Sequence, residues 1–118
     1  LSGEKKEEYR EIKQFWLKRL FNDNPYAVVD QNMIDEVIYE LKNKNISVIE
    51  LYDWAGMMPK KFTHVCFRNG YSKIAPEIWI ECDGIEIGLG MLTWGAERDT
   101  NYFIIQLGRI IVPPVKAQ

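Results

Sequence analysis

The sequence has few of the residues from which metal and catalytic sites are usually built. Among 118 residues there is one histidine, His64, and there are two cysteines, Cys66 and Cys82, with no CxxC pair and no Cys/His cluster. This excludes a zinc site of ordinary ligand spacing and leaves a Ser-His-Asp triad poorly supplied. We therefore predict no metal and no cofactor, and we expect both cysteines to be buried, reduced thiols of a cytoplasmic protein.

Two further absences limit the classes of partner. No hydrophobic run approaches the length of a transmembrane helix, so no membrane contact is predicted. The net charge is −2, so no bulk positive field draws the chain to nucleic acid, and such binding would need a local basic patch. Aromatic residues, in contrast, make up 13% of the chain, which supplies rings for a binding face as well as for a core.

Apolar residues at helical spacing predict helices in the first half of the chain. Isoleucine, tryptophan and leucine recur at positions 12, 16 and 20, and the turn formers of 22–25 follow them. A second apolar stripe predicts a helix over 32–43, with Asn32 as its cap. Ser47 and Glu50 have the spacing of a capping box, which predicts a third helix ending at Gly56, although the β-branched run over 46–49 is also compatible with a strand.

From position 62 the hydrophobic pattern changes to the period of two that is typical of strands. Apolar and polar residues alternate over 64–68, 78–82 and 85–89. Asp83-Gly84 lies between the last two segments and is a strong signal for a hairpin turn. A final strand over 102–112 ends at two prolines, which cannot continue a ladder. The second half of the chain therefore predicts antiparallel strands.

The opening octet carries a family resemblance. Gly3, Lys5, Glu8 and Arg10 match the spacing G-x-K-x-x-E-x-R, which is the signature of the ASCH family. The later stretches RNGY (68–71), WGAE (94–97) and QLGRI (106–110) follow in the order seen in phage and bacterial ASCH proteins. The chain thus resembles this family over residues 1–21 and about 62–112.

The resemblance implies an α+β fold in a single domain over residues 1–118. In that fold, a PUA-like antiparallel β-barrel has two or three helices packed at its side, and residues 22–60 would be a helical insertion. The signature segment would be a strand that lines a cleft, although the composition of 5–12 favours a helix.

A strict strand does not bring the signature residues together, because side chains alternate between its faces and Lys5 would lie opposite Glu8. A bulge or bend is needed, and Gly3 supplies backbone freedom just before it. In such a cleft, Lys5 would meet an anionic or carbonyl group while Glu8 fixes Arg10. The alternative is a solvated, salt-bridged strand that contributes little.

A second group of candidate binding residues comes from the later stretches. Arg68 and Asn69 suit base edges or phosphate, and Tyr71 suits stacking on a base, although Asn69-Gly70 is also a common loop dipeptide. Trp94 is either a stacking platform or a core residue beneath a loop.

Three functions follow as hypotheses. The first is a module that binds RNA or a modified nucleoside through Lys5, Arg10, Arg68 and aromatic rings. The second is a small enzyme, either a ribonuclease or an amidohydrolase acting on N4-acetylcytidine, with Lys5 and Glu8 as the catalytic pair. The amidohydrolase pattern of the family has a threonine where this chain has Glu8. The third is a phage-encoded domain that binds a protein partner through its helical insertion.

Overall fold

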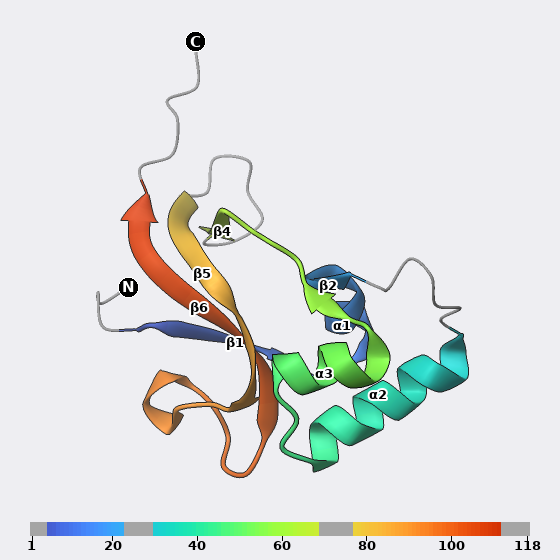
Figure 1. Cartoon of the computed structure of the whole chain (residues 1–118). Helices are drawn as coiled ribbons and strands as arrows, with labels where there is room; N and C mark the ends of the chain where they lie inside the picture. Colours follow the sequence, from blue (N-terminus) through green and yellow to red (C-terminus); the bar gives the residue numbers. More distant parts are fainter. Residues whose placement is uncertain (1–4, 23–29, 69–76, 112–118) are drawn as a thin grey trace.

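The computed structural model describes residues 5–22, 30–68 and 77–111 of the chain (Figure 1). In order, the elements are β1 (Glu7–Glu11), α1 (Gln14–Leu20), β2 (Phe21–Asn22), α2 (Gln31–Asn43), α3 (Val48–Ala55), β3 (Met58–Pro59), β4 (His64–Arg68), β5 (Glu77–Leu89), the short 3-10 helix η1 (Leu92–Trp94) and β6 (Asn101–Ile111). The predicted α+β class is confirmed, with three helices beside an antiparallel sheet. None of the helices in these ranges is long and apolar enough to cross a membrane.

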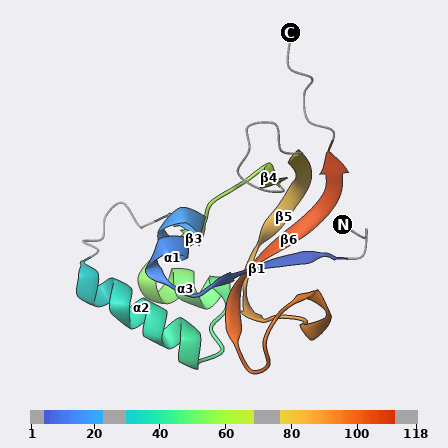
Figure 2. The ribbon, with the colours of Figure 1, turned by 180° about the vertical axis from the view of Figure 1, so that it is seen from behind.

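The main sheet has four strands in the order β1-β6-β5-β4, and every neighbouring pair is antiparallel. β1 and β4 are its two edges, and within the described ranges they do not pair with each other, so no closed barrel is seen. A second, two-stranded sheet joins β2 to β3. The three helices lie together on one side of the main sheet, as the view from behind in Figure 2 also shows.

The signature segment forms a strand, as predicted, over Glu7–Glu11. Its residues pair in register with β6, from Glu7 opposite Gln106 to Glu11 opposite Tyr102. Glutamate and arginine favour helix only weakly, and the hydrogen bonds of a sheet edge outweigh that preference. Tertiary context therefore decides the conformation of this segment.

The predicted hairpin turn at Asp83-Gly84 is wrong, because β5 continues through both residues. The register between β5 and β6 shifts on either side of Cys82, which is the mark of a β-bulge, and Gly84 has a φ of 149°. The carboxylate of Asp83 lies so close to Gly108 that an added Cβ there would be 2.8 Å from Oδ1. The turn-forming residues thus bend a long strand, and the chain reverses only after Leu89.

Local capping signals set the ends of α2 and α3. Asp30 rather than Asn32 caps α2, since its Oδ1 accepts a hydrogen bond from the backbone N–H of Met33 at 2.9 Å. The capping box of Ser47 and Glu50 is present, so the helix forms there and the alternative strand does not.

The core lies between these helices and the inner face of the sheet. Its buried side chains include Val37 and Leu41 of α2, Leu51 of α3, and Phe103 and Ile105 of β6. Residues 22–60 therefore supply a share of the core itself. Their status as an insertion relative to the ASCH family stays a prediction.

Candidate functional site

The structure brings three of the signature residues together. Lys5 precedes β1, so the alternation of the strand does not apply to it, and its Nζ lies 3.1 Å from Oε2 of Glu8. On the same carboxylate, Oε1 accepts a hydrogen bond from Nη1 of Arg10 at 2.9 Å. The departure from a strict strand that the signature requires thus occurs before Glu7. Gly3 lies outside the described residues.

Arg10 links this edge strand to helix α1. Its Nη1 also donates to the carbonyl oxygen of Tyr9 at 3.0 Å, and its guanidinium carbon lies 5.0 Å from the ring centroid of Trp16. The side chain of Arg10 is 27% exposed. It is therefore held by a carboxylate, a carbonyl and an aromatic ring, and part of it still faces solvent.

A second guanidinium is stacked on a neighbouring ring. The guanidinium carbon of Arg19 lies 3.4 Å from the ring centroid of Phe15, and Nη1 donates to the Phe15 carbonyl oxygen at 3.1 Å. Nζ of Lys13 lies 5.9 Å from the same ring. Phe15 and Trp16 meet edge to face, with centroids 5.0 Å apart. Helix α1 thus carries two adjacent aromatic rings, and each has an arginine against it, Arg10 from β1 and Arg19 from α1 itself.

A groove of about 450 Å³ lies between α1 and the edge strand β4. The residues that give it its chemical character are Arg10, Trp16, Arg19, Phe62, His64 and Cys66. Its other lining residues are apolar or sulfur-containing, and no aspartate or glutamate of the described ranges lines it. The groove is therefore apolar with cationic groups at its border.

The β4 wall of the groove adds an imidazole and a thiol. His64 stacks on Trp79 of β5, with ring centroids 4.3 Å apart and planes 11° from parallel. Nδ1 of His64 lies 2.8 Å from the hydroxyl of Thr63. Cys66 is exposed on this edge strand and Cys82 is half-buried, so the prediction of two buried thiols is wrong. Desolvation and a hydrogen bond with Glu77 raise the pKa of the Cys66 thiol.

The remaining predicted site residues do not join this groove in the described structure. Asn69 and Tyr71 lie outside the described residues. Arg68 ends β4, and its side chain is also outside the description. Trp94 is half-buried in η1, on the β5–β6 connection, which lies away from α1 in Figures 1 and 2.

Tyr9 ties that connection to the signature strand. Its hydroxyl donates to Oε1 of Glu7 at 2.7 Å and accepts from the backbone N–H of Met91 at 2.8 Å, and its ring packs on Tyr102 at 5.3 Å. Burial raises the pKa of Tyr9 to about 12, and the bond to Glu7 adds to this rise, while the bond from Met91 opposes it. The outer face of β1 thus has a structural role, and on its other face Arg10 lines the groove, whereas Glu8 and Lys5 do not.

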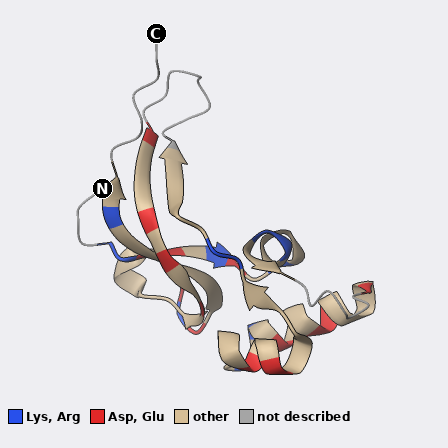
Figure 3. Cartoon of the chain, turned by 45° about the horizontal axis from the view of Figure 1, so that its top comes forward, with Lys and Arg blue, Asp and Glu red and all other residues tan. Residues whose placement is uncertain are grey.

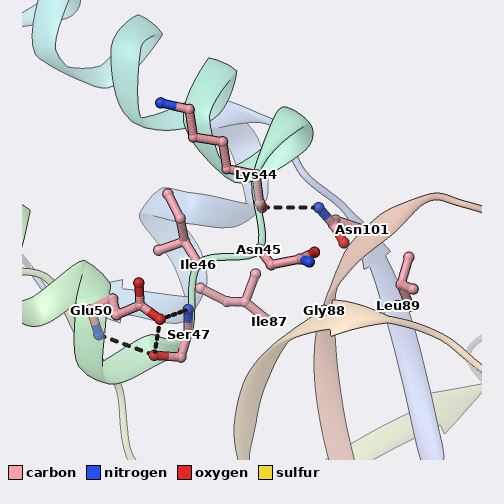
Figure 4. Close-up of a pocket in the computed structure, with 9 residues that line it drawn as sticks. All are labelled: Lys44, Asn45, Ile46, Ser47, Glu50, Ile87, Gly88, Leu89 and Asn101. Atoms are coloured by element: carbon pink, nitrogen blue, oxygen red, sulfur yellow. Dashed lines mark hydrogen bonds between the residues drawn. The ribbon is translucent and has the colours of Figure 1, made fainter.

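A second cavity of about 370 Å³ lies between the α2–α3 loop and the β5–β6 end of the sheet (Figure 4). Its polar groups are largely engaged in holding helix ends. Ser47 and Glu50 bond to each other, and Nδ2 of Asn101 donates to the carbonyl oxygens of Leu41 and Lys44. The polar groups of this cavity therefore have a structural role, because they hold the end of α2 against the sheet.

The analysis of the sequence missed the main walls of the groove. The sequence pattern places Trp16 on an apolar helix face, and no motif singles out Arg19 or Cys66. The signal for this wall is the stretch KQFWLKR (13–19), in which basic residues flank two adjacent aromatic residues and no carboxylate occurs.

Comparison with known proteins gives no relative from which a function could be transferred. No family model matches the chain, and neither the curated proteins nor the solved structures include one that is significantly similar to it. Within the described ranges there is also no group of three or more histidine, cysteine or carboxylate side chains that could hold a metal ion.

Proposed function

We propose that this chain binds a nucleotide unit, either free or within single-stranded RNA, in the groove between α1 and β4. The observation that carries the proposal is the pair of guanidinium groups stacked on Phe15 and Trp16 beside a groove without carboxylates. The resemblance of the opening octet to the ASCH signature points to the same class of ligand, and Arg10 belongs to both the octet and the groove. A PUA-like barrel, incomplete between β1 and β4, is the fold that we propose with it.

The chemistry of the groove matches the two parts of a nucleotide. Bases stack on aromatic rings and on arginine planes, and each stacked base contributes about 1–3 kcal/mol. A guanidinium binds phosphate oxygens through parallel N–H donors. Arg10 is oriented by Glu8 before any ligand arrives, so less side-chain entropy is lost on binding.

The distribution of charge favours an anion at this end of the molecule, although the whole chain carries −2. Helix α1 contains Lys18 and Arg19 and no acidic residue. Aspartate and glutamate lie mainly on β5, α2 and α3, and β1 carries glutamates beside Arg10, whereas the charged positions of α1 are all basic (Figure 3). The basic residues of α1, with Arg10, support the local basic patch that nucleic-acid binding requires.

Catalysis is the second candidate, and the contact between Lys5 and Glu8 favours it. A lysine next to a carboxylate is one arrangement for proton transfer. Glu8, however, accepts from both Lys5 and Arg10, which suits a carboxylate that positions two cations.

The hypothesis of a protein partner rests on α3, where Ile49 and Tyr52 are 71% and 52% exposed.

Equilibrium binding of a fluorescein-labelled, short single-stranded RNA, followed by anisotropy at several salt concentrations, tests the proposal. The Arg19→Gln variant should bind several-fold more weakly, and its slope of log K against log salt should fall by about 0.7, the value for one phosphate contact on a single strand. Arg98→Gln removes the same charge from the exposed β5–β6 connection and should leave both quantities unchanged. Absence of binding by the wild-type protein, or equal weakening by both substitutions, would refute the proposal.

A further inference from the structure

The two aromatic rings of α1 differ in their relation to the groove. Trp16 is half-buried and lines it, whereas Phe15 is 48% exposed and lies outside it. Successive residues of a helix point about 100° apart, so the two rings face different directions from neighbouring positions. Their planes meet at 81°. The helix therefore presents one ring inside the groove and one beside its border.

Arg19 contacts the exposed Phe15 ring and also lines the groove. Its guanidinium covers the ring at 3.4 Å. Within the described ranges it makes no ion pair with a carboxylate, and its side chain makes one hydrogen bond, from Nη1 to the carbonyl oxygen of Phe15. A guanidinium has five N–H groups, so most of the donors of Arg19 have no partner among the described residues and are available to a ligand at the border of the groove.

We infer that the ligand is a single-stranded oligonucleotide of at least two nucleotides. One base lies in the groove at Trp16, the next lies on Phe15, and the phosphodiester that joins them contacts Arg19. This inference rests on the proposed function and adds the length and strandedness of the ligand. Lys13, whose Nζ is 5.9 Å from the Phe15 ring, adds a second cation beside the outer base.

The geometry of the rings selects against a duplex. Bases in a duplex are stacked in parallel planes, whereas Phe15 and Trp16 are nearly perpendicular. Two bases that stack on these rings must be splayed apart, which the unpaired nucleotides of a single strand allow. A free nucleoside, in turn, would occupy the groove and leave the Phe15 platform unused.

Two probes of equal charge separate these cases. Adenosine 3′-(methyl phosphate) has one base and one phosphodiester, and the dinucleotide ApA has two bases and one phosphodiester. Titration calorimetry should show ApA binding roughly tenfold more tightly, which corresponds to one additional stacked base. In Phe15→Ala this advantage should disappear, while the affinity for the one-base probe stays within about twofold, because that probe does not reach Phe15 and Arg19 keeps its hydrogen bond to the backbone carbonyl of residue 15.

Control variants make the assay decisive. Phe15→Leu keeps an apolar side chain without a π face and should also lose the advantage, whereas Phe15→Trp should retain it and thereby report a folded platform. Tyr39→Ala removes an exposed ring of α2 that does not line the groove, and it should change neither affinity.

The outcomes distinguish the inference from the function on which it rests. If neither probe binds, the proposed function itself fails. Equal affinities of the wild-type protein for both probes would leave nucleotide binding intact and overturn the two-nucleotide site. Equal weakening of both probes by Phe15→Ala would place Phe15 in a site for one nucleotide, and this would also overturn the inference.

Discussion

Replacement of Asn101 should show how the helices are fastened to the sheet. Asn101 begins β6, and its Nδ2 donates to the carbonyl oxygens of Leu41 at 3.1 Å and Lys44 at 3.2 Å. Helix α2 ends at Asn43, so the carbonyl of Leu41 is one of the last four that a helix cannot satisfy internally, and Lys44 is the residue that follows the helix. A side chain of the sheet thus caps the C-terminal end of α2.

The expected loss of stability follows from the Nδ2 donor and the Oδ1 acceptor of the Asn101 amide. Asn101→Ala loses two hydrogen bonds that contribute about 1 kcal/mol each. Its Oδ1 is buried and has no hydrogen-bond partner in the described part of the chain, and truncation removes this unfavourable group as well. The net loss should therefore be about 1 kcal/mol. In Asn101→Asp an acceptor replaces the donor and faces two carbonyl oxygens, so the loss should reach about 3 kcal/mol.

Urea unfolding measures both values, with linear extrapolation and unchanged m-values. Asn45→Asp is a matched control, since Asn45 lines the same cavity but is exposed, and it should change stability by less than about 0.5 kcal/mol. A finding that Asn101→Asp is as stable as Asn101→Ala would refute the reasoning, because it would mean that no donor is needed at the end of α2.

Three further predictions concern the signature strand and its neighbours. Because burial raises the pKa of Tyr9 from 10.0 to about 12, the unfolded chain loses this proton first; stability should therefore fall as the pH rises from 10 to about 12, and urea titrations should show a smaller fall in Tyr9→Phe. Gly90→Ala would place a Cβ 2.5 Å from another side-chain carbon and should cost about 1–3 kcal/mol, whereas Gly88→Ala, with no atom within 4 Å, should be nearly neutral in thermal unfolding. Incubation with N4-acetylcytidine should release no cytidine, because Glu8 replaces the threonine of the amidohydrolase pattern; release that is lost in Lys5→Ala would favour the enzyme instead.

Local signals in the sequence predicted the parts of the fold that depend on neighbouring residues. The capping box at Ser47 and the stop at Gly56 define α3 because both act within one turn of the helix. Asp83-Gly84, in contrast, has the sequence of a hairpin turn but lies at a β-bulge within β5. Strand β6 is long enough to pair with both halves of β5, and no local pattern reveals that pairing.

In the candidate site, too, the local feature could be predicted from the sequence and the long-range one could not. Strand alternation alone predicted that a bend is needed near Lys5. In the structure β1 begins only at Glu7, so Lys5 lies before the strand and can reach Glu8. The groove itself could not be predicted, since it arises where α1 meets the edge strand β4, and Trp16 and Cys66 are 50 residues apart in the sequence. Such a meeting is set by packing over the whole core.

The most direct test of the central claim, that the groove between α1 and β4 is the binding site, uses Cys66. This thiol is exposed and lines the groove, so iodoacetamide should modify it at alkaline pH, where a thiol with a raised pKa still ionises. Peptide mapping by mass spectrometry separates Cys66 from Cys82. We predict that saturating single-stranded RNA slows modification of Cys66 severalfold, and that half-maximal protection of Arg19→Gln requires several-fold more RNA than that of the wild type. An unchanged rate of Cys66 modification in wild-type protein that is demonstrably saturated with RNA would contradict it.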